Sequence, residues 1–149
     1  MPRDAAEIAR LSADAMWADD KASQSLGMEI LEIGPGLAQL AMTVTERMLN
    51  GHGSCHGGYI FTLADSAFAF ACNSHGTPAV AQHCTITYVA PGRLGMRLVA
   101  VAQERQRGER SGIYDVKVRD EADTVIAEFR GHSRTLPGSL IDGAKSNGS

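Results

Sequence analysis

The apolar segment from Gly57 to about Asn73 constrains the fold of this chain more than any other feature. It is longer than an ordinary strand, and its side chains leave almost no polar face, which is typical of a helix enclosed by other structure. Several of its residues are alanines, among them Ala64, Ala67 and Ala71, which indicates that neighbouring elements approach the helix closely. We therefore expect a buried helix at the centre of the fold.

Strand-like segments stand on both sides of this helix. Gly34-Pro35-Gly36 is a strong turn signal between the two strands of a hairpin, at 28–33 and 37–44. Apolar and polar residues alternate in four later segments: 79–89, 94–104, 112–119 and 123–134. The short breaks between these segments predict an antiparallel meander. Residues 3–22 have apolar side chains at helical spacing, which predicts a further, N-terminal helix.

Together the elements predict an α+β fold in which a curved antiparallel sheet wraps around one central helix. One helix is too short to cover both faces of such a sheet, so the other face and the sheet edges must meet water or another subunit. The chain has 149 residues, which suits a single domain, predicted at 1–137. Gly and Ser are frequent in 138–149, so we expect a flexible tail there.

Composition and charge exclude several classes of protein. Hydrophobic residues make up 44% of the chain and charged residues 21%, which is typical of a globular domain. The net charge of −3 argues against nucleic acid as a partner. The longest wholly apolar run, 67–72, is far below the ~20 residues that span a bilayer, and no apolar core of signal-peptide length stands near the N-terminus. With three cysteines and no complete disulfide framework, we expect a cytoplasmic protein with reduced thiols and no membrane partner.

Two features of the segment 50–65 carry chemistry. Gly57 and Gly58 open the apolar helix, whose first backbone N–H groups have no partner within the helix and lie at the positive end of its dipole. Because glycine has no side chain to block a ligand, these groups suit a carbonyl oxygen that develops negative charge. The second feature is Asp65, which shares an apolar stripe of the helix with Phe68. A carboxylate there is either functional or a structural Asp bonded to a neighbouring backbone or hydroxyl group.

The spacing of Gly57 and Asp65 makes a prediction about assembly. Eight residues of helix span about 12 Å, so one substrate carbonyl cannot touch both groups of one subunit. If both act on the same carbonyl, they come from two subunits whose helices lie side by side and run in opposite directions. We therefore expect a homodimer to form the active site.

The run from Asn50 to Asn73, with Cys55-His56-Gly57-Gly58 and Leu63-Ala64-Asp65, closely resembles the PaaI branch of the hotdog-fold thioesterase superfamily. The resemblance extends from the first helix to about Arg134 and includes Met48-Leu49-Asn50-Gly51, Pro91-Gly92, Gly112-Ile113-Tyr114-Asp115 and Phe129-Arg130-Gly131. It implies a hotdog fold and hydrolysis of acyl-CoA thioesters in phenylacetate degradation. Phenylacetyl-CoA and its ring-hydroxylated derivatives are the substrates that it implies.

The resemblance also implies roles for four residues. The Gly57 N–H polarises the thioester carbonyl, and Asp65 of the partner subunit acts as nucleophile or as general base for water. Asn50 positions substrate or water, and His56 orients the site through hydrogen bonds. In some relatives a hydroxyl residue from the next strand holds the water, but Ala81 stands at the matching position here, so both roles of Asp65 stay open. The family needs no metal or other cofactor, since coenzyme A is part of the substrate, and its dimers often pair into tetramers.

Five further residues are candidates for binding the acyl-CoA substrate: Gly58, Tyr88, Pro91, Arg93 and Arg107. The two arginines suit the phosphates of coenzyme A, because a guanidinium group binds phosphate through paired hydrogen bonds. They also suit a solvated hairpin of mixed charge, since Glu104 and Glu109 stand among the basic residues.

Other interpretations of the segment 50–65 have weaker support. His52, Cys55 and His56 are too few for a closed zinc site, and no second Cys/His pair completes it. Cys55 beside His56 suggests a thiol nucleophile, but adjacent residues at a helix start do not readily form a hydrogen-bonded pair. A non-catalytic acyl-CoA binding or sensing protein would more often lack the carboxylate, and a hotdog dehydratase would use a catalytic His within a different motif. Because the carboxylate and the glycine-started helix are both present, the sequence favours a thioesterase.

Overall fold

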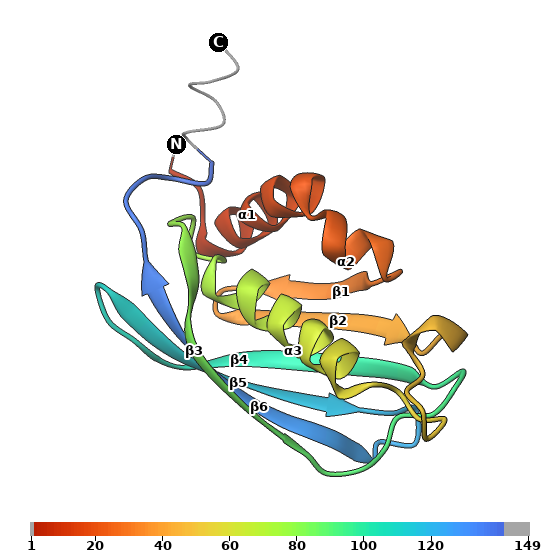
Figure 1. Cartoon of the computed structure of the whole chain (residues 1–149). Helices are drawn as coiled ribbons and strands as arrows, with labels where there is room; N and C mark the ends of the chain where they lie inside the picture. Colours follow the sequence, from red (N-terminus) through yellow and green to blue (C-terminus); the bar gives the residue numbers. More distant parts are fainter. Residues whose placement is uncertain (1, 142–149) are drawn as a thin grey trace.

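A six-stranded antiparallel sheet curves around one long helix in the computed structural model, which describes residues 2–141 (Figure 1). The helices are α1 (Ala5–Asp19), α2 (Lys21–Ser25), a 3-10 turn η1 (Glu46–Met48) and α3 (Gly57–Cys72). The strands are β1 (Glu29–Gly34), β2 (Leu37–Thr43), β3 (Ala79–Tyr88), β4 (Arg97–Arg107), β5 (Ser111–Arg119) and β6 (Val125–Thr135). Their order in the sheet is β1-β2-β4-β5-β6-β3. This confirms the α+β architecture, with α3 as the enclosed helix.

The meander predicted for the last four strands is wrong for the first of them. β4, β5 and β6 are consecutive neighbours, but β3 pairs with β6 and β4 pairs with β2. The segment 89–96 between β3 and β4 is longer than a tight hairpin turn, and it carries the chain past β6 and β5 to the other side of the sheet.

Small side chains allow α3 to lie close to the sheet. Ala64 and Ala67 of the helix are fully buried, and so are Ala100 and Ala102 of β4, against which the helix lies. Because none of these residues has a side chain beyond Cβ, the two backbones approach closely, and a larger residue at any of these positions would push them apart. The alanines therefore act as the sequence predicts.

An aromatic cluster fixes α3 against the last two strands. The Phe68 ring lies 5.7 Å from the ring of Tyr114 on β5 and 5.8 Å from that of Phe129 on β6. A Cβ atom at Gly131 would lie 2.7 Å from the Phe68 ring, so only glycine leaves room for the ring at this point of β6. Phe61, nearer the start of the helix, also contacts Phe129, at 5.5 Å. The helix is thus held at two points along its length.

The N-terminal helix predicted at 3–22 is wrong in its extent, because the structure has two helices there. Asp20 ends α1 with non-helical backbone angles, φ −84° and ψ 79°. Its carboxylate accepts a hydrogen bond from the Ser23 N–H at 2.9 Å and so begins α2. Aspartate favours such an N-cap over a position inside a helix. The main helix α1 then lies against β1, with Ala9 and Ala13 buried (Figure 1).

The strand predicted at 94–104 is also wrong in its bounds, since β4 covers Arg97–Arg107. Gly95 has a left-handed backbone with φ 87°, and the Met96 N–H donates to the Arg93 carbonyl at 3.0 Å. These residues therefore form a tight turn before the strand begins.

Part of the C-terminal segment predicted as a flexible tail is attached to the fold. The Leu140 N–H donates to the Gly76 carbonyl at 2.9 Å, and a Cβ atom at Gly76 would lie 3.8 Å from the Ile141 side chain. Residues 138–141 therefore contact the loop that follows α3. The remainder of the predicted tail, 142–149, lies outside the described residues.

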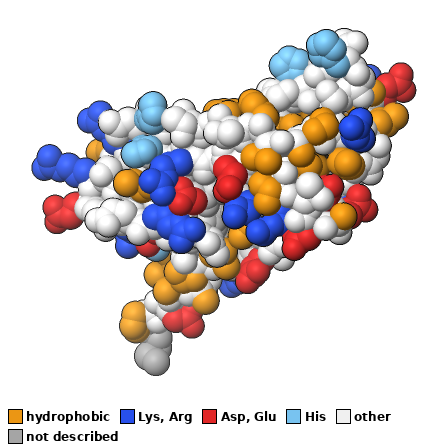
Figure 2. Space-filling model, turned by 90° about the horizontal axis from the view of Figure 1, so that it is seen from below, with side chains coloured by type: hydrophobic (Ala, Val, Ile, Leu, Met, Phe, Trp, Pro, Cys, Tyr) orange, Lys and Arg blue, Asp and Glu red, His pale blue; other side chains and the backbone are white. Residues whose placement is uncertain are grey.

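The two edge strands of the sheet differ. β1 carries Glu29 and Glu32 and lies beside α1, whereas β3 has no Asp, Glu, Lys or Arg, and most of its side chains are exposed. A long uncharged edge strand is suited to pairing with another strand. The outer face of the sheet, seen from below in Figure 2, instead carries interspersed charges such as the Arg105–Asp115 pair. No helix within residues 2–141 has the length and hydropathy needed to cross a membrane.

Candidate active site

The first backbone N–H groups of α3 differ in whether they have a hydrogen-bond acceptor. The Gly58 N–H donates to Nδ1 of His56 at 2.9 Å, and the Tyr59 N–H donates to the His56 carbonyl at 3.0 Å. His56 thus caps the helix through its ring, and its role in orienting the site stays a prediction. The Gly57 N–H has no acceptor among the described residues. Of the two glycines expected at the site, only Gly57 therefore keeps a donor for a ligand.

A pocket of about 380 Å³ opens beside Gly57. It is lined by Ser54, Cys55, Gly57, Ile60, Tyr88, Val89, Ala90 and Pro91. Three of the residues predicted from the sequence, Gly57, Tyr88 and Pro91, thus lie together, although they come from the start of α3, the end of β3 and the loop after β3. The Gly92 carbonyl accepts a hydrogen bond from the Cys55 N–H at 2.8 Å, which holds the chain after Pro91 beside the pocket. Arg93 is the next residue along this chain.

Asn50 is held by the loop that leads into the pocket. Its side-chain Oδ1 accepts hydrogen bonds from the His52 N–H at 2.9 Å, the Ser54 N–H at 3.2 Å and the Ser54 hydroxyl at 3.3 Å. Its Nδ2 has no partner among the described residues, so this amide group is available as a donor. The contribution of Ser54 was missed in the sequence, although an Asn followed by turn residues is a known signal for such a loop.

Asp65 has the unusual environment that the sequence indicates. Its carboxylate is half-buried, and it has no hydrogen bond or ion pair to any of the residues described. Burial raises the pKa of this carboxyl group. Burial, together with the charge of Asp65, also raises the pKa of Cys72, to about 12, and that of Cys84. The alternative of a structural Asp bonded to a neighbour therefore finds no support, because Asp65 makes no such bond within the part of the chain that the structure describes.

The two reactive groups lie too far apart to act on one carbonyl within a subunit. Gly57 and Asp65 both lie on α3, whose rise places them about 12 Å apart along the axis. Arg107 is further away still, since it lines a pocket with Cys72 and His75 at the opposite end of the helix. The structure therefore brings Gly57, Tyr88 and Pro91 together and leaves Asp65 and Arg107 apart from them.

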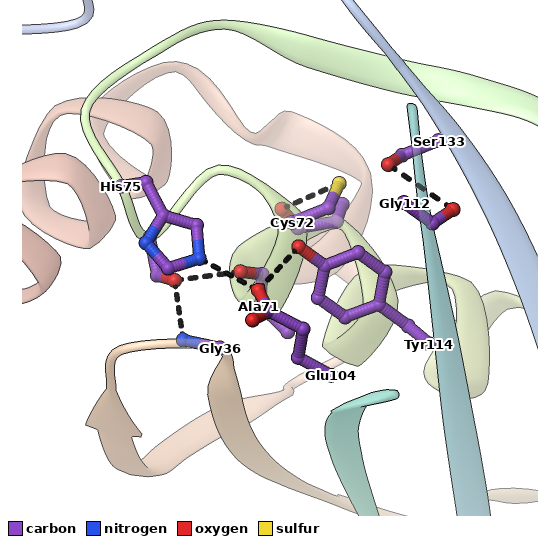
Figure 3. A network of polar contacts seen from close by, with 10 residues as sticks. Gly36, Ala71, Cys72, His75, Glu104, Gly112, Tyr114 and Ser133 are labelled. Atoms are coloured by element: carbon purple, nitrogen blue, oxygen red, sulfur yellow. Dashed lines mark hydrogen bonds and ion pairs between the residues drawn. The ribbon is translucent and has the colours of Figure 1, made fainter. Parts of the chain in front are cut away.

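The opposite end of α3 is closed by a polar network (Figure 3). Nε2 of His75 lies 2.7 Å from Oε1 of Glu104, and the Tyr114 hydroxyl donates to the same oxygen at 2.9 Å. Burial alone would raise the pKa of Glu104. The hydrogen bonds from His75 and Tyr114, with the charges of His75 and Arg107, outweigh burial and hold that pKa below its usual range. Every group of this network has its partner inside the subunit.

The structure gives no support to the metal and thiol interpretations. No group of three or more His, Cys, Asp or Glu side chains within residues 2–141 lies close enough to hold a metal ion. The Cys55 thiol donates to the His56 carbonyl at 3.6 Å rather than to its ring, and burial raises the pKa of this thiol. A raised pKa disfavours the thiolate that a nucleophilic cysteine needs.

Comparisons with known proteins agree with this geometry. The model of the thioesterase superfamily matches residues 52–127. The chain is 46% identical over 129 residues to the acyl-coenzyme A thioesterase PaaI of Escherichia coli, covering 87% of this chain and 92% of that protein. The structure of the E. coli PaaI protein from the phenylacetic acid degradation operon superposes with a TM-score of 0.90, at 44% identity, over 91% of this chain and 99% of that one. A Streptococcus mutans protein bound to acetyl CoA matches with a TM-score of 0.73, at 26% identity, over 75% of this chain and 90% of that chain.

Proposed function

The chain belongs to the thioesterase superfamily, and we propose that it is an acyl-CoA thioesterase that hydrolyses phenylacetyl-CoA and ring-hydroxylated phenylacetyl-CoA in phenylacetate degradation. One observation carries this proposal. The same helix presents a Gly57 N–H without an acceptor and an Asp65 carboxylate without a hydrogen-bond partner among the described residues. The substrate class comes from E. coli PaaI, which is an acyl-coenzyme A thioesterase from the phenylacetic acid degradation operon. The cytoplasm, where acyl-CoA thioesters are made and used, is the compartment that we propose.

The active site of this proposal lies between two subunits. The uncharged, exposed edge of β3 is suited to pairing with β3 of a second copy, which places two α3 helices side by side. With the helices antiparallel, Asp65 of the partner subunit reaches the Gly57 pocket that it cannot reach within its own subunit. We propose that two such dimers form a tetramer.

Each group then has one part in the hydrolysis. The Gly57 N–H donates to the thioester oxygen, whose negative charge grows as the carbonyl carbon becomes tetrahedral. Asp65 of the partner subunit either takes a proton from the attacking water or attacks the carbonyl carbon itself. In both cases the C–S bond breaks and coenzyme A leaves as a thiolate that takes up a proton. With water as the attacking group the free acid forms at once, whereas attack by Asp65 gives an anhydride that a water molecule then hydrolyses to the acid and the free Asp65 carboxylate. The free Nδ2 of Asn50 donates to substrate or water beside the carbonyl. Pro91 lines the pocket and Arg93 follows it two residues later, and we propose that both contact the coenzyme A chain.

A panel of thioesters tests the proposal. Release of the coenzyme A thiol is measured with phenylacetyl-, hydroxyphenylacetyl-, benzoyl- and straight-chain acyl-CoA, for the wild type, Asp65→Asn and the control Asp19→Asn. We expect turnover of arylacetyl-CoA to fall by roughly 10²–10⁴-fold in Asp65→Asn, the usual contribution of a general base, and to be unchanged in the exposed control. A folded wild type that releases no thiol from any thioester would contradict the enzyme and favour the binding or sensing protein.

A further inference from the structure

The ring of Tyr88 occupies the space that a side chain at residue 57 would need. A Cβ atom built on Gly57 would lie 2.9 Å from Cζ, 3.0 Å from the hydroxyl oxygen and 3.2 Å from Cε1 of Tyr88. Gly57 does not have a positive φ, so its backbone does not require glycine. The position of the Tyr88 ring therefore requires glycine at residue 57, whether or not a substrate is bound.

A hydrogen bond joins the same two residues. The Tyr88 hydroxyl donates to the Gly57 carbonyl at 2.8 Å. Burial, and secondarily the charge of Cys55, raises the pKa of this hydroxyl, so it keeps its proton and stays a donor at neutral pH. Tyr88 is the last residue of β3, and Gly57 is the first residue of α3. The contact therefore ties the start of the helix to the end of the edge strand.

We infer that Tyr88 is a positioning residue, which acts on the reaction through Gly57 rather than through the substrate. The inference rests on the proposed function, in which the Gly57 N–H must meet a carbonyl attacked with the help of a partner carboxylate. Because β3 is the strand proposed to pair with the second copy, the contact holds the N–H in a fixed relation to the dimer interface. Gly57 and Tyr88 both line the pocket that Ser54 and Pro91 also line, so the contact between them lies at the proposed site itself.

The first test separates positioning from substrate binding. Tyr88→Phe keeps the ring and removes the hydroxyl. The matched control is Tyr59→Phe, at the same end of the helix, which removes a hydroxyl that bonds to none of the residues 2–141. Loss of one hydrogen bond is expected to lower kcat for arylacetyl-CoA by roughly 3- to 10-fold with KM unchanged, while the control retains both constants. A raised KM with unchanged kcat would overturn the inference, because it indicates direct contact with the substrate.

The second test does not depend on activity. Thermal unfolding is measured for Gly57→Ala, Tyr88→Ala and the double variant. Alone, Gly57→Ala is expected to displace the tyrosine ring and lower Tm. In the Tyr88→Ala background the same change is expected to raise Tm, since alanine favours a helix over glycine. Additive changes in Tm would overturn the inference. If the two changes in Tm are not additive but the wild type has no thioesterase activity, the Gly57–Tyr88 contact stands and only the proposed function is contradicted.

Discussion

The polar groups at the C-terminal end of α3 are hydrogen-bonded within the subunit, whereas some at the N-terminal end have no partner among the described residues. At the C-terminal end, the side chain of Asn73 makes hydrogen bonds to the backbone of Ala69 and Ala79, and His75 pairs with Glu104 (Figure 3). At the N-terminal end, the N–H of Gly57 has no partner among the described residues, and neither has the amide Nδ2 of Asn50. Unpaired polar groups cost free energy in a fold, so a protein keeps them where a ligand will pair with them.

This difference teaches which residues serve stability and which serve chemistry. Asp65 lies between the two ends. Like the groups at the N-terminal end, its half-buried carboxylate has no partner among the described residues. Changes at the closed end are expected to act on folding, whereas changes at the open end are expected to act on turnover. The predictions that follow test this division.

Removal of the Gly57 N–H is expected to have the largest effect. Gly57→Pro deletes this one donor, and proline is favoured at the first position of a helix. The preceding residue, His56, has φ −59° and ψ 133°, a conformation compatible with a following proline. We expect kcat for arylacetyl-CoA to fall by roughly 10²–10³-fold, as for other single oxyanion donors.

The matched variant is Gly57→Ala, which also displaces the Tyr88 ring but keeps the N–H. Its loss of turnover is expected to be much smaller than that of Gly57→Pro. Equal losses in the two variants would show that crowding of the pocket, rather than the missing donor, accounts for the effect.

Asn73→Ala tests the closed end. The variant loses hydrogen bonds of 2.8 Å and 3.0 Å from Nδ2 to the carbonyls of Ala69 and Ala79, and one of 2.8 Å from the Ala79 N–H to Oδ1. We expect the free energy of unfolding to fall by about 2–4 kcal/mol, from three lost bonds at a buried site, as measured by denaturant unfolding. Gln24→Ala, which removes an exposed side-chain hydrogen bond, is expected to cost about 1 kcal/mol or less. Equal losses would contradict the assigned role of Asn73.

The pH dependence of turnover gives the smallest expected effect. Burial disfavours the charged form of Asp65 and raises its pKa, and the charged form is the active one. The acidic limb of kcat/KM is therefore expected to lie above the ordinary aspartate pKa of about 3.9. Because a raised pKa means that the fold loses stability as pH rises through it, Asp65→Asn is expected to unfold at a higher temperature than the wild type at pH 7. A lower Tm for this variant would indicate a structural carboxylate.

The sequence predicts the central helix and the six strands along the chain because their signals are local. It does not predict the place of β3 at the edge beside β6, which depends on contacts between distant segments. The apolar run of α3 and the Gly34-Pro35-Gly36 turn each depend on neighbouring residues only. The bounds of α1 and β4 were wrong because single capping and turn contacts set them. Asp20 ends a helix through its hydrogen bond to Ser23, and Gly95 delays a strand through its left-handed backbone.

The site divides in the same way. Gly57 and Asp65 were identified because a helix start and a carboxylate on an apolar stripe are visible in the sequence. Tyr88 was named only as a candidate for binding the substrate. Its contact with Gly57 was not predicted, since the two lie 31 positions apart in the chain and only the return of β3 beside α3 brings them together. The free Nδ2 of Asn50 likewise depends on how the loop through Ser54 closes.

Mixed oligomers give the most direct test of the central claim, that Gly57 of one subunit acts together with Asp65 of the partner subunit. Asp65→Asn and Gly57→Pro are each expected to be nearly inactive, and they are co-expressed with different tags so that hybrid dimers can be counted. In a hybrid, one of the two sites combines an intact N–H with an intact carboxylate. Random assortment should therefore restore about a quarter of the wild-type activity. Hybrids no more active than the separate variants would contradict the claim and place both groups in the site of a single subunit.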